Sequence, residues 1–377
     1  MSEFRKSLAT MFASFLFCLL VIEIVLQFLP VRTGLEVQEV DADHPVIRFT
    51  PNRDFVFSDG WRLTNVNHGH VNNEGFVNDQ DYVRDDRRPL LAIIGDSYIE
   101  AAMVRYKLTV QGRLAAEQPA TQRVYSFGSS GSSLLDYLFY AVYARQHFHP
   151  DWVVINVVGN DFDEMLLRYK KLKAFHYLEE EPDGSFKPVL IEYHPSLGRM
   201  VLRHSALARY VILNLGVTPP WVARLLHGDT AALPSPVGSA FAADEPRYVG
   251  NTASDASAQR VELSKRAVDY VLDHLQPMTG LDPAHVLFMV DSYRIFDPAT
   301  LATLRASYFG VMRDYFIAEA RARGYEVQDL QDWFAARYAR DGSAFSYPDD
   351  AHWNPIGHEE AANAIRASKF YARFTAQ

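Results

Sequence analysis

Short apolar segments alternate with helical patterns along the chain from residue 89 onward. Five segments have the apolar character of buried strands, some with the polar loop that follows: residues 90–96, 123–131, 151–161, 285–294 and 325–330. Helical patterns occupy residues 99–118, 134–148, 299–324 and 354–370. This order predicts an α/β fold, a doubly wound and mostly parallel sheet with helices on both faces. The short apolar runs fit strands that are covered on both faces.

Two regions fall outside this alternation and divide the chain into parts. Residues 33–88 are polar and rich in turns, with short alternating segments that predict a small β-rich preface. Residues 162–258 interrupt the alternation and predict an insertion, a candidate lid or substrate-binding flap. The main domain then covers residues 89–377.

The first 32 residues predict a membrane anchor. Residues 7–31 are apolar apart from Glu23, and about 20 such residues span a bilayer. Arg5 and Lys6 precede them, which favours an N-terminus inside and the bulk of the chain outside. No small-residue cleavage motif follows, so we expect an uncleaved signal anchor. A cleaved signal peptide and a buried soluble helix are the alternatives.

Composition excludes several classes of function. The net charge of -9 argues against a nucleic-acid surface, which needs clustered Lys and Arg. The single cysteine, Cys18, lies in the apolar N-terminal segment, so the rest of the chain has no disulfide, Cys-based zinc site or Cys nucleophile. The glycine-rich residues 128–133 lack the Lys of a phosphate loop and the spacing of a dinucleotide fingerprint. We therefore expect no cofactor and no metal.

Polar residues and glycines follow the predicted strands. They are Gly95, Asp96 and Ser97 after the first strand, Ser126, Gly128 and Gly131 after the second, and Gly159, Asn160 and Asp161 after the third. Carboxylates and imidazoles lie in residues 347–358, just before the last helix. Because ligands bind at the carboxyl ends of such strands, we expect these groups to lie together. They supply the nucleophile, oxyanion donors, base and orienting acid that acyl transfer needs.

Ser97 also has a purely structural interpretation. The residues from Ser97 to Glu100 match a capping box, in which the hydroxyl and the carboxylate satisfy backbone amides at the start of a helix. The local sequence is compatible with both a cap and a nucleophile.

Four blocks of sequence, in this order, resemble those of the SGNH, or GDSL-type, hydrolase superfamily. They are GDSY at residues 95–98, YSFGSSGSS at 125–133, GND at 159–161 and DDAHWNPIGH at 349–358. The pattern NNEGFVND at residues 72–79, together with the N-terminal anchor, resembles membrane-anchored bacterial members. The insertion is a departure from the pattern.

The resemblance implies a role for each residue. Ser97 would be the nucleophile, His352 the base and Asp349 the acid that orients the imidazole. The neighbouring Asp350 is the rival for that last role. The oxyanion would be bound by the backbone amides of Ser97 and Gly131 and by the side chain of Asn160.

These expectations combine into one function with two alternatives. The resemblance implies a membrane-anchored serine esterase, with its catalytic domain in the bacterial periplasm or at the cell surface, that acts on O-acyl and in particular O-acetyl esters of an exported carbohydrate. The first alternative is a polysaccharide O-acetyltransferase that uses the same acyl-enzyme. The second is a non-catalytic carbohydrate-binding protein on the same fold.

Other polar residues have structural interpretations. We expect Asp96 to bind backbone amides of its own loop, Trp353 and His358 to pack or cap at the last helix, and Arg294 to form an ion pair. The lysine-rich residues 170–173 have the composition of a solvated face.

Overall fold

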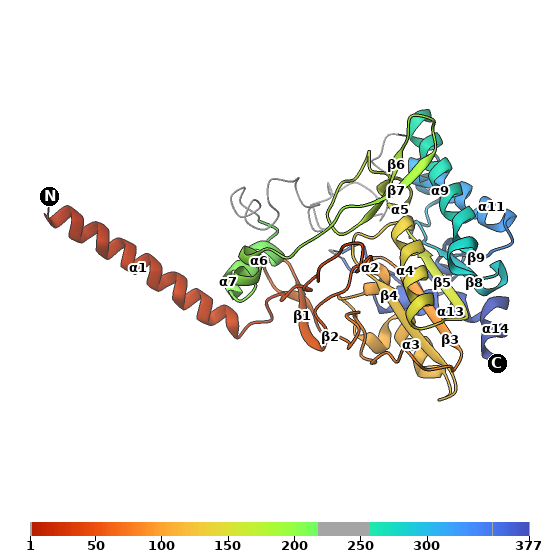
Figure 1. Cartoon of the computed structure of the whole chain (residues 1–377). Coiled ribbons are helices and arrows are strands. Elements are labelled where there is room, and N and C mark those ends of the chain that lie inside the picture. The colour runs from red at the N-terminus through yellow and green to blue at the C-terminus, as the bar shows by residue number, and fades with distance from the viewer. Residues whose placement is uncertain (1, 218–255, 349, 377) are drawn as a thin grey trace.

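The structure, a computed structural model, describes residues 2–217, 256–348 and 350–376. Its centre is a five-stranded sheet with the order β4-β3-β5-β8-β9. The strands are β3 (Leu90–Gly95), β4 (Arg123–Gly128), β5 (Trp152–Val157), β8 (Val286–Val290) and β9 (Glu326–Asp329). Every adjacent pair is parallel, so the predicted α/β fold is confirmed (Figure 1).

Side chains of β3 alternate between the two faces of the sheet, as the two-residue period of a strand requires. Leu90, Ala92 and Ile94 belong to one buried cluster, and Leu91 and Ile93 belong to another. The first cluster includes residues of α4 (Leu134–His147), α9 (Ala258–Thr279) and α11 (Tyr308–Ala322). The second includes residues of α3 (Val110–Glu117), α12 (Leu330–Asp341), α13 (Pro355–Arg366) and α14 (Lys369–Thr375). Helices thus cover both faces.

The strand order places a topological switch point between β3 and β5. The chain passes from β3 to β4 on one side and then crosses back to β5 on the other side of β3. In such sheets, the loops that leave the two strands at this point diverge and open a crevice at their carboxyl ends. The loops that carry Ser97 and Asn160 flank this crevice.

The N-terminal part consists of a long helix and a hairpin. Helix α1 (Ser2–Gln27) is long and apolar enough to cross a membrane by its length and composition, and the apolar window within it is not buried against the rest of the protein. Strands β1 (Arg53–Asp59) and β2 (Thr64–Val71) form an antiparallel hairpin within the predicted preface. Phe55 and Phe57 of β1 pack in one cluster with residues 101–104 of the main domain.

The predicted insertion contains its own small elements as far as it is described. They are α5 (Asp161–Glu164), the antiparallel hairpin of β6 (His176–Glu180) and β7 (Phe186–Leu190), α6 (Leu197–Leu202), α7 (Ala206–Arg209) and a π-helical turn (Tyr210–Asn214). Residues 218–255 of the predicted insertion lie outside the described residues.

Two predicted helices are each divided in the structure. The pattern at 99–118 becomes α2 (Ser97–Glu100), a 3₁₀ turn (Tyr106–Leu108) and α3, because Ala101 adopts a left-handed conformation with φ 47°. The pattern at 299–324 becomes α10 (Pro298–Arg305) and α11. A further 3₁₀ turn covers Pro283–His285.

A serine cap and a glycine separate α10 from α11. Ser307 accepts a hydrogen bond from the backbone of Gly310 and so begins α11. A Cβ on Gly310 would lie 2.3 Å from the carbonyl oxygen of Arg305, so the close approach of the two helices requires glycine here. The apolar periodicity continues across this break, which is why the pattern alone predicts one helix.

Candidate active site

The loop after β3 presents Ser97 at the first residue of α2. The carboxylate of Asp96 accepts a hydrogen bond from the backbone of Tyr98 at 3.0 Å and thereby caps the helix. The predicted structural role of Asp96 is confirmed. The predicted capping box of Ser97 and Glu100 is wrong, because Glu100 instead accepts hydrogen bonds from the amide and hydroxyl of Ser130 at 2.7 and 2.8 Å. The Ser97 hydroxyl is therefore not engaged in capping.

The Ser97 hydroxyl lies against an imidazole from the far end of the main domain. The distance from Ser97 Oγ to His352 Nε2 is 2.8 Å, although the two residues are 255 positions apart. On the other side of the ring, His352 Nδ1 lies 2.5 Å from Asp350 Oδ1. A carboxylate can only accept, so Nδ1 carries the proton and Nε2 of the neutral ring accepts from the serine hydroxyl. This is the order of contacts found in serine hydrolases.

The predicted orienting acid Asp349 lies outside the described residues. The contact with His352 is made by its neighbour Asp350, the rival of the sequence analysis. Asp350 Oδ1 also accepts from the backbone amide of His352 at 3.0 Å. A side chain that binds the backbone two residues ahead is a recurrent local turn. The spacing Asp-x-His, which permits this turn, is the signal that could have favoured Asp350.

For both His352 and Asp350, burial shifts the pKa in one direction and the charged partner shifts it in the other. Burial favours the neutral imidazole, but the hydrogen bond and the negative charge of Asp350 outweigh it and hold the pKa of His352 above its usual value. Burial also disfavours the carboxylate, yet the hydrogen bonds and charge of His352 hold the pKa of Asp350 below its usual range. The pair is thus built to stabilise an imidazolium when the ring takes up a proton.

Two further contacts fix the loops that carry Ser97 and His352. The hydroxyl of Tyr98 donates to the carbonyl of Ala351 at 3.2 Å, which joins the residue after the serine to the residue before the histidine. The indole of Trp353 donates to Asp291 at 2.9 Å. Both loops are therefore held by side chains adjacent to the reacting groups.

The predicted oxyanion donors follow the two strands that flank β3. Gly131, in the loop after β4, has a φ of 86°, and a Cβ there would lie 3.2 Å from the ring of Phe175. Asn160, after β5, begins α5, and its Nδ2 donates to Glu164 at 3.1 Å. One amide proton of Asn160 is thereby fixed, which leaves its second proton for a ligand.

Lys170 connects these two donor loops. Its ammonium donates to the carbonyl of Gly131 at 2.5 Å and to Glu164 at 2.6 Å, and Glu164 is the group that holds Asn160. The side chain of Lys170 is only 11% exposed, so the predicted solvated face is wrong at this residue. Lys171 and Lys173 are exposed as predicted. A lysine that binds a carbonyl across 39 positions leaves no local pattern by which the sequence could have revealed it.

The comparison with protein families decides the class of the protein. The model of the GDSL-like lipase/acylhydrolase family matches residues 91–365, which includes every residue of the site described above. The chain belongs to this family. It is accordingly an enzyme of the GDSL acylhydrolase type.

Solved structures with a similar chain course include hydrolases. LAE5, an α/β hydrolase enzyme from the metagenome of Lake Arreo, Spain, is 15% identical, with a TM-score of 0.39, over 74% of this chain and 94% of that chain. A lipase/acylhydrolase from Enterococcus faecalis is 12% identical, with a TM-score of 0.35, over 74% and 93%. The acetyl xylan esterase AlAXEase is 12% identical, with a TM-score of 0.35, over 73% and 97%. The search of curated proteins found no match.

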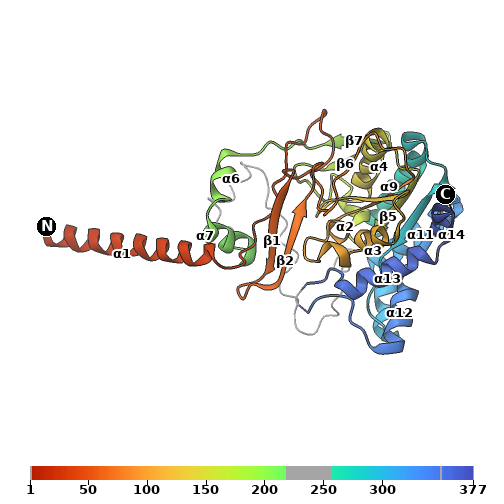
Figure 2. The ribbon, with the colours of Figure 1, turned by 90° about the horizontal axis from the view of Figure 1, so that it is seen from below.

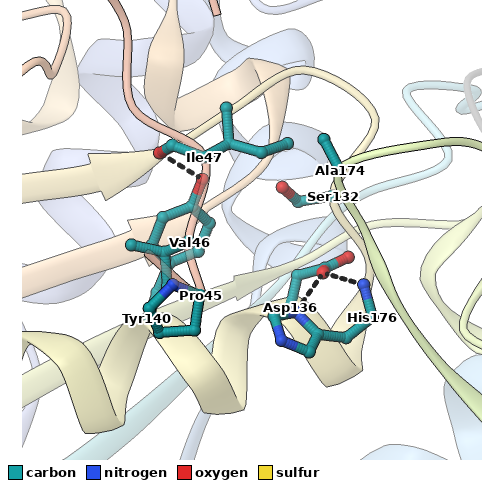
Figure 3. Close-up of a pocket in the computed structure, with 8 residues that line it drawn as sticks. All are labelled: Pro45, Val46, Ile47, Ser132, Asp136, Tyr140, Ala174 and His176. Carbon is teal, nitrogen blue, oxygen red and sulfur yellow. Dashed lines mark hydrogen bonds and ion pairs between the residues drawn. The ribbon is translucent and has the colours of Figure 1, made fainter. Parts of the chain in front are cut away.

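A second group of Ser, His and Asp side chains in this GDSL acylhydrolase has a structural role. Asp136 accepts from the backbone of His176 at 2.9 Å and contacts its Nδ1 at 3.2 Å, whereas Ser132 lies apart from this pair (Figure 3). The His176 ring stacks on Phe139 with the ring centres 3.7 Å apart. The small hollow around the group has no room for a water molecule. His176 therefore ties β6 to α4.

The remaining structural interpretations are confirmed. Arg294 forms an ion pair with Asp291 at 3.2 Å. Trp353 is fully buried, and the buried His358 accepts from the backbone of Val110 at 3.3 Å. Burial lowers the pKa of His358 to about 3, so this ring stays neutral and serves packing. Among the described residues, no group of three or more His, Cys, Asp or Glu side chains is placed to hold a metal ion.

Proposed function

We propose that this GDSL acylhydrolase is a membrane-anchored serine esterase that removes O-acyl groups, in particular O-acetyl groups, from carbohydrate. The observation that carries the proposal is the pair of contacts of His352, 2.8 Å to Ser97 Oγ and 2.5 Å to Asp350. The carbohydrate substrate and the periplasmic or cell-surface location rest on the sequence resemblance and on the apolar helix α1.

In the first half of the reaction, the proton of Ser97 Oγ passes to His352 Nε2 while the oxygen attacks the acyl carbonyl. Asp350 stabilises the imidazolium that forms. The negative carbonyl oxygen accepts hydrogen bonds from the Ser97 and Gly131 amides and from the Asn160 side chain. The tetrahedral intermediate then expels the alcohol, which takes the proton from His352, and the acyl group stays on Ser97.

In the second half, water replaces the alcohol. His352 takes a proton from a water molecule while the water oxygen attacks the acyl-enzyme. The same donors bind the second oxyanion. When the intermediate collapses, the proton returns to Ser97 Oγ and the free acid leaves.

Acyl transfer to a sugar hydroxyl is the second candidate. The insertion supplies Lys170, which donates to the Gly131 carbonyl, and Phe175, whose ring would lie 3.2 Å from a Cβ on Gly131. This region therefore packs against the loop of a proposed oxyanion donor. A covered site slows the attack of water on an acyl-enzyme and favours a bound acceptor. Family membership and the Ser97–His352 contact argue against the non-catalytic alternative.

The test uses the full chain in uncharged detergent with p-nitrophenyl acetate as substrate. The expected result is release of p-nitrophenol, reduced at least roughly 10³-fold in Ser97→Ala. A fluorophosphonate probe should label the native protein and not this variant. Addition of a panel of neutral and acidic oligosaccharides then separates the two candidates, because transfer produces acetylated oligosaccharide and hydrolysis produces acetate. Unchanged turnover and labelling in Ser97→Ala would overturn the proposal.

A further inference from the structure

A second cavity lies away from the catalytic residues, next to the membrane helix. Its volume is about 150 Å³, and it lies between residues 33–37, which follow α1, and the helical segment formed by α6, α7 and the π-helical turn. The lining combines apolar side chains with guanidinium groups, among them Leu35, Leu202, Ile212, Arg199, Arg203 and Arg209. A cavity with this lining suits a ligand that is both anionic and apolar.

The cavity has more positive than negative charge. Arg203 pairs with Glu36 at 2.6 Å, but the same carboxylate also pairs with Arg53 at 2.5 Å. Arg199 donates to a neutral partner, the hydroxyl of Tyr193. Glu36 is therefore shared by two arginines. In the part of the chain that the structure describes, no carboxylate forms an ion pair with the guanidinium of Arg199.

Arg209 adds to this surplus. Its Nε is buried and has no hydrogen-bond partner among the described residues. Among the described residues, the negative charge that acts on Arg209 is that of Glu23, a residue of α1, and the positive charge of Arg53 opposes it. A buried guanidinium N–H without a partner is costly, and a bound anion would satisfy it.

The membrane helix is attached to the wall of this cavity. Glu23 of α1 accepts hydrogen bonds at 2.8 Å from the Ser205 hydroxyl and from the amides of Ala206 and Leu207, so it caps α7. In both views, α6 and α7 lie on the side of the folded body from which α1 projects (Figures 1 and 2). An apolar span of about 20 residues that begins after Lys6 ends close to Gln27. With α1 across a bilayer, α7 would lie at the depth of the lipid headgroups.

We propose that this cavity binds an anionic phospholipid of the membrane that holds α1. The phosphate would accept hydrogen bonds from Arg199 and Arg209, and the first part of an acyl chain would pack on Leu35 and Leu202. Guanidinium groups match phosphate oxygens well, and anionic headgroups concentrate at the membrane surface. The inference rests on α1 lying in a membrane and is independent of the esterase reaction.

The experiment measures lipid binding to the full chain in uncharged detergent by native mass spectrometry. Dioctanoyl phosphatidylglycerol is compared with dioctanoyl phosphatidylcholine and with inorganic phosphate. The expected result is saturable binding of phosphatidylglycerol, at least tenfold tighter than that of the other two. The double variant Arg199→Gln/Arg209→Gln should lose this preference. Arg321→Gln/Arg340→Gln, which removes two exposed arginines of α11 and α12, should keep it.

Three outcomes of this experiment would contradict the lipid proposal. Equal binding of the two lipids would show that charge does not select the ligand. Tight binding of inorganic phosphate would identify a simple anion site. Unchanged binding in Arg199→Gln/Arg209→Gln would place the lipid elsewhere. Turnover of p-nitrophenyl acetate by the variants reports whether they are folded. If the native chain shows no turnover, that result contradicts the esterase proposal and leaves the lipid proposal unaffected.

Discussion

The carboxylate of Asp350 contacts both the ring and the backbone amide of His352 through one oxygen. This double contact fixes the ring so that Nδ1 carries the proton. In Asp350→Asn the amide group can donate to Nδ1, which stabilises the tautomer that cannot accept the serine proton. We expect kcat to fall roughly 10³–10⁴-fold. The measurement is steady-state hydrolysis of p-nitrophenyl acetate by the full chain.

The matched control for this prediction is Asp349→Asn. It removes the same charge one position earlier and tests the acid that the sequence pattern favours. We expect Asp349→Asn to retain most of the activity. A large loss in Asp349→Asn with little effect of Asp350→Asn would reverse the assignment.

The raised pKa of His352 predicts the pH dependence of the reaction. The ring must be neutral to take the serine proton, and the charge of Asp350 stabilises the protonated ring. Activity should therefore rise with pH, and kcat/KM should reach half its maximum above 6.5, the ordinary value for histidine. In Asp350→Asn the same limb should move to lower pH. A half-maximum below 6.5 in the native enzyme would contradict this prediction.

The proximity of Ser97 and His352 could be predicted from the sequence, because each lies in a block that resembles a family block with a fixed place in the strand order. The family pattern favours Asp349, whereas the structure shows Asp350 in contact with the ring. That contact goes with a local turn, in which Asp350 accepts from the backbone amide of His352, and only the Asp-x-His spacing hints at it in the sequence. The contacts of Lys170 could not be predicted from the sequence either, because its partners come from two other loops.

The insertion contacts the loops of two proposed oxyanion donors through Lys170. Because this side chain holds the Gly131 carbonyl and, through Glu164, the amide of Asn160, its removal should loosen two oxyanion donors together. We expect Lys170→Met to lower kcat roughly tenfold to a hundredfold, with little change in KM. This is less than the roughly 10²–10³-fold effect of losing a donor outright.

Lys171→Met is the matched control for this prediction, since Lys171 is the exposed neighbour. Lys170→Arg should recover part of the activity, because a guanidinium can donate to the same two oxygens. An equal loss of activity in both methionine variants would argue for a general effect of charge. A rise in KM with unchanged kcat in Lys170→Met would place Lys170 in substrate binding.

The junction of α10 and α11 gives a prediction about stability. Alanine is a better helix former than glycine by about 1 kcal/mol, so Gly310→Ala should stabilise an isolated helix. Here the added Cβ would lie 2.3 Å from the backbone of Arg305 and force the two helices apart. We expect a net loss of about 1–3 kcal/mol in the free energy of unfolding. Chemical unfolding of the native chain and the variant checks it, and an unchanged or raised stability would contradict it.

The sheet and its covering helices could be predicted because their signal is local. Apolar runs mark the strands, and apolar spacing marks helices such as α4 and α13. The breaks within 99–118 and 299–324 could not be predicted, because the apolar periodicity continues through them. At Ala101 and Ser307 the backbone nevertheless leaves the helical conformation. Caps and close contacts of this kind depend on what a neighbouring segment leaves room for.

The arrangement of α1 and the folded body gives a prediction for the cell. A helix of 26 residues is about 39 Å long, enough to cross the roughly 30 Å apolar part of a bilayer. We expect the full chain to remain in the membrane fraction after an alkaline carbonate wash. Protease added to the outside of spheroplasts should digest the body while α1 is retained. Release by carbonate would show a peripheral attachment, and protection from protease would place the body inside.

The way in which anchor and body join could not be predicted from the sequence. Glu23 reads as a costly charge in an apolar helix, whereas in the structure it caps α7, 182 positions and more away. A contact over that distance depends on the complete fold. The same limit applies to the cavity proposed to bind lipid, because one wall is formed by residues 33–37 and the other by residues 193–213.

The 255 positions between Ser97 and His352 also bear on when the protein becomes reactive. A ribosome makes the serine long before the histidine, and if the chain is exported from its N-terminus, the two residues emerge in the same order. Until the later segment docks and the Tyr98 hydroxyl meets Ala351, the serine has no base and remains an ordinary alcohol. The nascent chain is thereby unable to attack acyl esters that it meets during synthesis. The protein therefore becomes able to hydrolyse esters only once it has folded, and only in the compartment where folding ends.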